Sequence, residues 1–211
     1  MTPFAPHPSA IVLGIGGCSG SGKTTLAEAL AHTLGGIPFP LDNYYRDLSH
    51  VPPAERAATN FDDPATIESS LLAAHVSALA RGEAIERPLY DFSQHIRIPE
   101  RTETIAPAPF LIVEGIFALC YAELLPLYRL RIFVDTPDNT CFARRLERDI
   151  SARGRTEESV RLQYENTVRP AAIRWVRPSA GSADLVVDGT GNLDWSVERV
   201  VSELRRRSLH P

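Results

Sequence analysis

Residues 10–25 read AIVLGIGGCSGSGKTT, an apolar run that leads into a glycine-rich turn and the start of a helix. Gly17, Gly22, Lys23 and Thr24 match the pattern G-x-x-x-x-G-K-[ST], in which a backbone loop surrounds the phosphates of a nucleotide. The glycines let the backbone approach the phosphates, and the helix adds the positive end of its dipole. The lysine supplies a cation for the outer phosphates, and the threonine hydroxyl can ligate Mg²⁺. The stretch therefore predicts a strand, a phosphate-binding loop and a helix, in that order.

The choice of basic residues supports this interpretation, because Lys23 is the single lysine of the chain beside 21 arginines. An ammonium group is a compact point charge and a guanidinium is a planar fork, so the two are not interchangeable. The alternative is a glycine-rich turn between a strand and a helix that binds no ligand. The lone lysine favours a nucleotide-binding loop. We expect the nucleotide to contact Gly17, Cys18, Ser19, Gly20, Ser21, Gly22, Lys23, Thr24 and Thr25.

Composition limits the classes of function. The 211 residues are 44% hydrophobic and 23% charged, as in a soluble globular protein. The net charge of −4 leaves no large basic excess, so nucleic acid is not an expected partner. Three cysteines without metal-ligand spacing indicate reduced thiols and a cytoplasmic protein. Residues 1–9 are predicted to be a flexible lead without the features of a signal peptide, and no apolar run is long enough to predict a membrane span.

Strand and helix patterns alternate along the chain. Strands are predicted at residues 10–15, 37–41, 110–113, 130–134 and 185–187. Helices are predicted at residues 23–34, 65–81, 139–151, 157–177 and 195–207, and Pro170 should kink or split the fourth of them. Residues 46–64 are predicted to be loops with one short helix. This order is typical of an α/β fold with a doubly wound parallel sheet and helices on both faces. We expect a single domain over residues 10–211 with a β-hairpin inserted at residues 84–106.

Two carboxylates follow strands of the predicted sheet. Asp42 comes after the second strand and Glu114 after the third, so both should lie at the edge that carries the phosphate loop. A carboxylate there can hold Mg²⁺ or accept the proton of an attacking hydroxyl, and phosphoryl transfer requires both roles. The alternatives are a turn residue for Asp42 and a capping carboxylate for Glu114.

Residues 139–156 form an arginine-rich helical segment. It carries Arg144, Arg145, Arg148, Arg153 and Arg155. One interpretation is a solvated helix face with local ion pairs to Glu147, Asp149, Glu157 and Glu158. The other is a lid that closes over the transferred group and neutralises its charge. Its proximity to a phosphate loop favours the lid.

Several further motifs follow the phosphate loop in a fixed order. They are LDNYYRDLSH, TNFDDPATIE, PLYDFSQHIR, LIVEGI, FVDTP, RRLERDISARGRT and QYENTVRPA. The ordered set, over about residues 11–192, resembles the uridine kinases (uridine–cytidine kinases) of the phosphoribulokinase/uridine kinase family, which are P-loop kinases. The resemblance implies transfer of the γ-phosphoryl group of ATP or GTP to the 5′-hydroxyl of uridine or cytidine, with Mg²⁺. It also implies a homo-oligomer, commonly a tetramer, whose contact surface could include the hairpin.

The resemblance also implies roles for individual residues. Asp42 would be the catalytic base, and Thr24 and Glu114 would serve Mg²⁺. Lys23, Arg148 and Arg153 would meet the phosphates. Aromatic side chains would enclose the nucleoside: Tyr45, Phe61, Tyr90 and Phe92. Asp62 and Arg145 would bind the ribose hydroxyls. His95 and Arg155 would lie near the polar edge of the base, and Gln163 would be a further contact.

The sequence departs from the uridine kinase pattern in places, so two alternatives stay open. The interval from Lys23 to Asp42 is shorter than is usual among uridine kinases. Residues 187–192 are one residue shorter than the corresponding family motif and lack its arginine. In relatives this segment lies near the nucleotide base. The first alternative is a sister kinase for nicotinamide riboside, ribulose 5-phosphate or pantothenate. The second is a nucleotide-binding regulatory protein without transfer activity.

Overall fold

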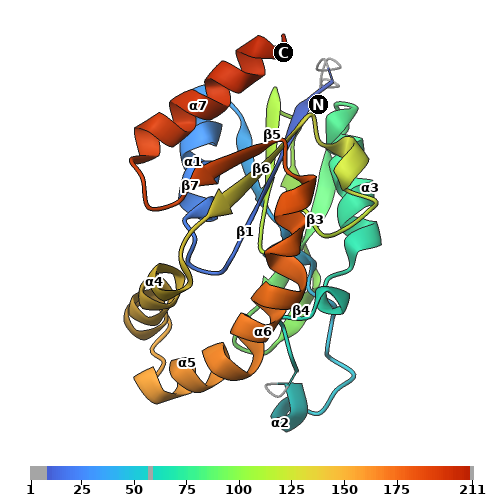
Figure 1. Cartoon of the computed structure of the whole chain (residues 1–211). Coiled ribbons are helices and arrows are strands. Elements are labelled where there is room, and N and C mark those ends of the chain that lie inside the picture. Colours follow the sequence, from blue (N-terminus) through green and yellow to red (C-terminus); the bar gives the residue numbers. More distant parts are fainter. Residues whose placement is uncertain (1–8, 57–58, 210–211) are drawn as a thin grey trace.

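A five-stranded parallel sheet forms the centre of the protein (Figure 1). The computed structural model describes residues 9–56 and 59–209, so the predicted flexible lead, apart from residue 9, lies outside the described residues. The strands lie side by side in the order β2 (Ile37–Pro40), β5 (Phe110–Glu114), β1 (Ile11–Gly17), β6 (Leu130–Asp135) and β7 (Leu185–Asp188). All four pairings are parallel, which confirms the predicted sheet.

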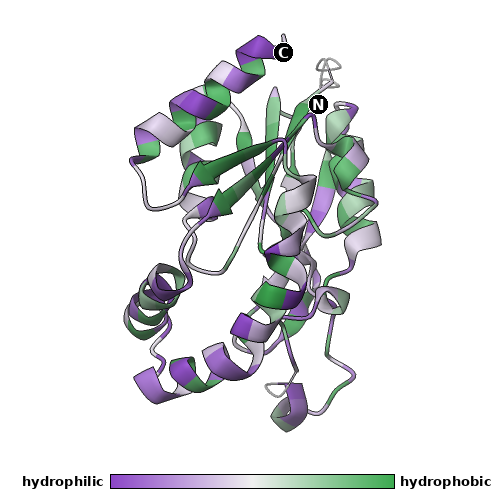
Figure 2. Cartoon of the chain, viewed as in Figure 1, coloured by the Kyte–Doolittle hydropathy of each residue, from purple (hydrophilic) through white to green (hydrophobic). Residues whose placement is uncertain are grey.

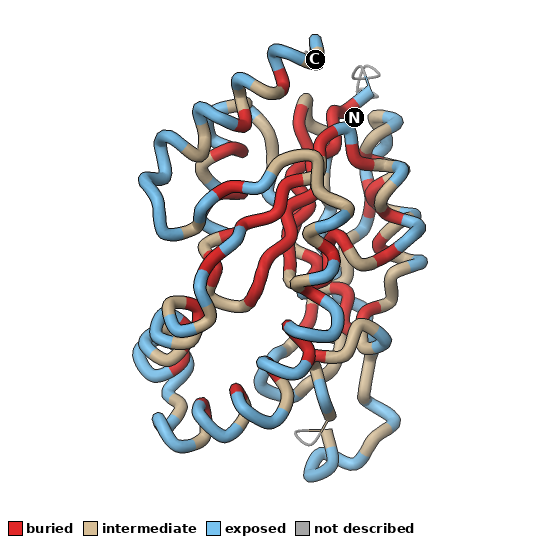
Figure 3. Tube along the Cα trace, in the orientation of Figure 1, coloured by how far each residue is buried: buried red, intermediate tan, exposed pale blue. Residues whose placement is uncertain are grey.

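Helices cover both faces of the sheet, and the central strands are therefore apolar on both sides (Figures 2 and 3). All seven residues of β1 are buried. On one face pack α1 (Lys23–Leu34) and α7 (Leu193–Arg206), whose Leu30 and Val200 are fully buried in one shared core. The bounds of α1 are those predicted from the leucine spacing, because Gly35 ends the helix in a left-handed conformation (φ +64°).

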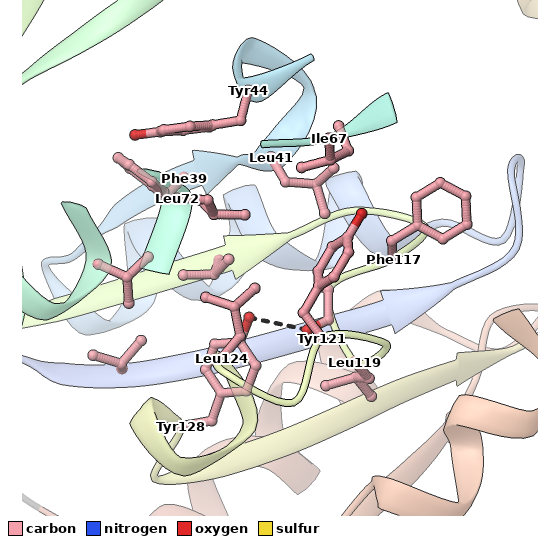
Figure 4. Packing of buried hydrophobic residues seen from close by; sticks show 14 of the residues in the cluster. Phe39, Leu41, Tyr44, Ile67, Leu72, Phe117, Leu119, Tyr121, Leu124 and Tyr128 are labelled. Carbon is pink, nitrogen blue, oxygen red and sulfur yellow. Dashed lines mark hydrogen bonds between the residues drawn. The ribbon is translucent and has the colours of Figure 1, made fainter. Parts of the chain in front are cut away.

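The second core lies on the other face of the sheet, beneath α3 (Ser69–Ala80) and the irregular segment of residues 116–128 (Figure 4). The segment contains the short 3₁₀ turn Leu125–Leu127. Tyr128 anchors it, because the buried hydroxyl donates to the carbonyl oxygen of Ala118 at 3.0 Å. The Tyr128 ring occupies the space beside Gly14, where a Cβ atom would lie only 2.6 Å from the ring.

Several element boundaries differ from the predicted ones because side chains cap the chain locally. The helix predicted from residue 65 starts at Ser69, since Asp63 instead caps a 3₁₀ turn (Pro64–Thr66) by accepting from the amide of Ala65 at 2.9 Å. The helix predicted from residue 195 starts at Leu193, because the Asn192 side chain caps it. Leu41 begins the 3₁₀ turn Leu41–Tyr44 and does not end β2.

The predicted hairpin is present as β3 (Ile85–Asp91) and β4 (Ile96–Ile105), paired antiparallel. One short helix, α2 (Pro53–Arg56), lies in the loops before it. Arg97 of β4 attaches the hairpin to the segment after β2: its guanidinium donates to the carbonyl oxygen of Tyr45 at 3.1 Å and pairs with Glu68 at 2.6 Å. The hairpin is therefore fixed against the chain that follows Asp42.

The arginine-rich segment forms α4 (Asp138–Ser151), and residues 157–176 form one long helix. The long helix consists of α5 (Glu157–Gln163), π-helical turns at Tyr164–Val168 and Ala172–Val176, and α6 (Arg169–Ala171) between them. The α-helical pattern is thus split around Pro170, but the chain stays helical and bends between α5 and α6 (Figure 1). The 3₁₀ turn Pro178–Ser182 follows. Within the described residues no helix combines the length and apolar character needed to cross a membrane.

Candidate active site

The predicted phosphate-binding loop connects the end of β1 to the first turn of α1. Gly20 and Gly22 have φ angles of +84° and +96°, in the left-handed region that favours glycine. A Cβ atom at Gly20 would also collide with the carbonyl oxygen of Cys141. The side chains of Cys18 and Ser21 are buried, and burial raises the pKa of the Cys18 thiol. These two residues therefore offer a nucleotide only their backbone groups.

Residues from two distant segments hold the outside of this loop. The Thr136 hydroxyl, just after β6, donates to the carbonyl oxygen of Ser21 at 3.0 Å. Gly189, just after β7, packs so closely on Ser21 and Thr136 that a Cβ atom would collide with both. Arg144 of α4 donates to the carbonyl oxygen of Gly189 at 2.8 Å. The segment that departs from the uridine kinase pattern therefore lies directly against the phosphate loop.

The side chains of Thr24 and Glu114 meet at the carboxyl edge of the sheet. The Thr24 hydroxyl donates to Oε1 of Glu114 at 3.2 Å. The other carboxylate oxygen, Oε2, is buried and has no hydrogen-bond partner among the described residues. Burial raises the pKa of Glu114, and Lys23 opposes this rise. An unpartnered carboxylate oxygen beside a hydroxyl and an ammonium fits a Mg²⁺ ion that would take its remaining ligands from phosphates and water.

Asp42 lies at the same edge, because β2 and β5 pair in parallel with Pro40 opposite Glu114. Its side chain is open to solvent on one side, but the protein around it desolvates the carboxyl and raises its pKa. Lys23, Arg153 and Arg148 lower the pKa in turn, since nearby cations favour the carboxylate. Lys23 and two arginines of the arginine-rich segment therefore lie close enough for their charges to act on the carboxyl of Asp42.

Four of these arginines surround one fully buried carboxylate, Asp149 of α4. The ion-pair interpretation is confirmed for Asp149 alone among its named partners, and that residue is interior and not on a solvated face; the lid stays a prediction. Glu157 pairs with Arg161 at 2.7 Å and not with the cluster. The arginines are Arg145, Arg148, Arg153 and Arg155, and their nearest distances to Asp149 run from 2.8 to 3.6 Å.

The polar residues predicted to hold a nucleoside are also brought together. Arg145, largely buried, donates to the Gln163 side chain and to the Ser19 hydroxyl, both at 2.8 Å. Arg155 donates to the same oxygen of Gln163. Burial lowers the pKa of Arg145, and the negative charge of Asp62 opposes this. The two residues predicted to bind the ribose therefore interact electrostatically. Asp62 is buried and accepts a hydrogen bond from Thr167 at 2.7 Å.

The predicted aromatic residues form one continuous cluster. Ring centroids lie 5.4 Å apart for Tyr45 and Phe61, 5.6 Å for Tyr45 and Tyr90, and 5.2 Å for Tyr90 and Phe92. His95 stacks on Phe61 at 4.7 Å with an angle of 22° between the rings. The Tyr90 hydroxyl is buried without a hydrogen-bond partner among the described residues, and Phe92 is exposed. Apolar faces with one free polar group are suited to a flat, polar-edged ring.

Sequence reasoning missed three residues that organise this site. Asp149 was considered only as one of several local ion-pair partners, and its complete burial was not visible in the pattern. Arg97 and Thr167 were not singled out at all. All three stand within motifs of the sequence, and this was the available signal: Arg97 in PLYDFSQHIR, Asp149 in RRLERDISARGRT and Thr167 in QYENTVRPA.

The chain is similar to known uridine kinases along most of its length. It is 41% identical over 197 residues to the uridine kinase of Chloroflexus aggregans, covering 92% of this chain and 94% of the relative. It is 41% identical over 189 residues to the uridine kinase of Escherichia coli strain K12, covering 86% of this chain and 88% of the relative. The sequence resemblance to uridine kinases is thereby confirmed.

Solved structures of lower sequence identity share the fold. The phosphoribulokinase from Rhodobacter spheroides has a TM-score of 0.62 at 15% identity, covering 85% of this chain and 70% of that chain. The D-glycerate 3-kinase from Cryptococcus neoformans has a TM-score of 0.63 at 18% identity, covering 87% and 88%. The family model described as "Phosphoribulokinase / Uridine kinase family" matches residues 12–196. With a phosphate loop, a facing carboxylate and an arginine cluster at one edge of the sheet, the chain belongs to the phosphoribulokinase/uridine kinase family of P-loop kinases.

Proposed function

We propose that the protein phosphorylates the 5′-hydroxyl of uridine and cytidine, with ATP or GTP as donor and Mg²⁺ as the metal. The observation that carries the proposal is the position of Asp42 at the edge of the sheet that carries the phosphate loop, two residues after Pro40, which pairs with Glu114. Lys23, Arg148 and Arg153 lie close enough for their charges to act on its carboxyl. A carboxylate opposite the cations that bind phosphates is where an attacking hydroxyl must lose its proton. The 41% identity to uridine kinases supports the choice of acceptor.

On the donor side, the loop of residues 17–25 binds the phosphates through its backbone N–H groups, and Lys23 contacts the outer phosphates. Thr24 and Glu114, whose side chains meet at this edge, would hold Mg²⁺, which would neutralise phosphate charge. Arg148 and Arg153 stabilise the charge on the transferred group. Asp42 accepts the proton of the acceptor hydroxyl, and its raised pKa suits a proton acceptor better than an ordinary aspartate pKa does.

On the acceptor side, Asp62 and Arg145 bind the ribose hydroxyls. The aromatic cluster of Tyr45, Phe61, Tyr90 and Phe92 encloses the base. His95, Arg155 and Gln163 offer hydrogen bonds to the nucleoside. Those of His95 and Arg155 reach toward the polar edge of the base. Such hydrogen bonds discriminate between related substrates more strongly than apolar contacts do.

A panel of acceptors tests this proposal. With magnesium and ATP or GTP, the purified protein should convert uridine and cytidine to their monophosphates and should act far less on 2′-deoxyuridine. The variant Asp62→Ala should lose most of this preference, because Asp62 would no longer distinguish the ribose. Faster turnover of nicotinamide riboside, ribulose 5-phosphate or pantothenate would assign a sister kinase. Nucleotide binding without conversion of any acceptor would assign a regulatory protein.

The raised pKa of Asp42 predicts an acid limb in the pH profile of kcat/KM for uridine at saturating donor. A proton acceptor must be ionised, so activity is lost as the pH falls through this pKa. The loss should begin above the range of an ordinary aspartate, about pH 3.9. Arg148 lowers the pKa of Asp42, so the variant Arg148→Met should shift the limb to higher pH. An unshifted limb in this variant would contradict the assignment.

A further inference from the structure

One buried carboxylate joins the two halves of the candidate active site. Asp149 is fully buried on α4, and its two oxygens serve different arginines. Oδ1 accepts from Nε and Nη2 of Arg148 at 3.0 and 2.8 Å and pairs with Nη1 of Arg153 at 3.3 Å. Oδ2 pairs with Nε of Arg145 at 3.6 Å and with Nη1 of Arg155 at 3.5 Å. Each oxygen thus holds one pair of arginines.

The two arginines on Oδ1 and the two arginines on Oδ2 have different surroundings. Arg148 and Arg153, on Oδ1, are the pair whose charge reaches Asp42. Arg145 and Arg155, on Oδ2, share Gln163 as a second acceptor. The charges of the first pair therefore act on the predicted proton acceptor. The second pair is held at the predicted nucleoside contact Gln163, and Arg145 also donates to Ser19 of the phosphate loop. Within the described part of the chain, Asp149 is the one residue that forms ion pairs with all four side chains.

Asp149 offsets the electrostatic repulsion among the four arginines. Four guanidinium groups around one carboxylate carry an excess of positive charge and repel one another. The carboxylate is the buried countercharge that keeps them together. Removing it would leave Arg148 and Arg153 free to move away from Arg145 and Arg155, which keep Gln163 as an acceptor. The excess charge that remains suits a site that receives phosphate groups.

We propose that Asp149 is a positioning residue that fixes the donor-side pair, Arg148 and Arg153, relative to the acceptor-side pair, Arg145 and Arg155. When an acceptor contacts Arg145 and Arg155, Asp149 thereby holds Arg148 and Arg153 in position for the transferred phosphoryl group. The inference rests on the proposed function, since it assumes a phosphoryl transfer between these two sides. Asp149 itself touches neither substrate.

Kinetics of Asp149→Asn test the inference, with Glu147→Gln as the matched control. Glu147 is an exposed carboxylate on the same helix, and its variant should behave as wild type. Asp149→Asn should lower kcat by about 10- to 100-fold, the scale of a small misplacement of catalytic groups. The donor KM should change less than roughly three-fold, because the phosphate loop is intact. Asp149→Glu keeps the charge but displaces it, and should give an intermediate kcat.

A measurement without turnover keeps the test independent of the proposed function. In the ligand-free wild type, NMR relaxation of the arginine Nε–H groups should show restricted motion at Arg148, whose Nε donates to Asp149. In Asp149→Asn this group should become mobile, whereas Arg145 keeps its hydrogen bonds to Ser19 and Gln163 and should stay restricted. Unchanged motion of Arg148 would overturn the inference, as would an unchanged kcat or a parallel loss of kcat, donor affinity and melting temperature. If Asp149→Asn does not fold, Asp149→Glu decides: an unchanged kcat overturns the inference. Failure of the wild type to phosphorylate any acceptor would overturn the proposed function instead.

Discussion

Asp42→Asn should lower kcat for uridine and cytidine by about 10²- to 10⁴-fold, the usual range for removal of a general base. An amide cannot accept the proton of the attacking hydroxyl, whereas it occupies nearly the same volume as the carboxyl. Asp42 lies in the 3₁₀ turn after β2 with its side chain open to solvent on one side, so the substitution should leave the fold and the acceptor KM nearly unchanged. Steady-state rates at saturating donor and a direct measurement of nucleoside binding would separate the two effects.

The control for this variant is Glu198→Gln, which removes an exposed carboxylate of α7 outside the candidate site. It should retain wild-type kcat. A kcat of Asp42→Asn equal to that of Glu198→Gln would exclude Asp42 as the proton acceptor. The structure would then leave Asp42 as a turn residue, the alternative that its sequence context allows.

Lys23→Met should lower kcat/KM for the donor by about 10²- to 10³-fold, the scale for loss of one preorganised charge in an active site. Methionine keeps much of the length and apolar character of the lysine stem but lacks the ammonium group. Lys23 is buried at the first turn of α1, so few other groups can replace its charge at the outer phosphates. Turnover at varied donor concentration, with uridine saturating, would measure the loss.

Lys23→Arg is the informative companion to that variant. A planar guanidinium is larger than an ammonium and cannot fit the same buried place, so arginine should recover little of the lost activity. The exposed residue Arg174 provides the control, since Arg174→Met removes a cation outside the site and should change nothing. Full activity of Lys23→Arg would show that charge alone suffices, and would remove the significance of the lone lysine.

The sequence predicted best what depends on local pattern. The phosphate loop, the bounds of α1 and the edge on which Asp42 and Glu114 lie all follow from residue spacing and from the rule that parallel strands end together. The aromatic cluster was predicted by resemblance alone, because its members come from three separate segments around residues 45, 61 and 90–95. The roles of the individual residues in binding and catalysis stay predictions until the experiments above are done.

The rest could not be predicted because it depends on tertiary contacts. The spacing of Arg145, Asp149 and Arg153 along a helix allows ion pairs but does not reveal that Asp149 is fully buried. Pro170 predicted a disturbance of its helix, but the residue pattern did not show that the chain would stay helical, with π-helical turns on both sides of α6. Likewise, nothing in the pattern shows that Arg97 fastens the hairpin to the carbonyl oxygens of Tyr44 and Tyr45.

The central place of β1 has a consequence for how the protein is made. Its neighbours β5 and β6 are encoded far downstream, and Thr136 and Gly189, which hold the phosphate loop from outside, come later still. The loop motif therefore leaves the ribosome long before the strands and side chains that give it shape. A nascent chain that ends before β6 should therefore carry the motif without a formed nucleotide site, and we expect donor binding only once Gly189 has been added.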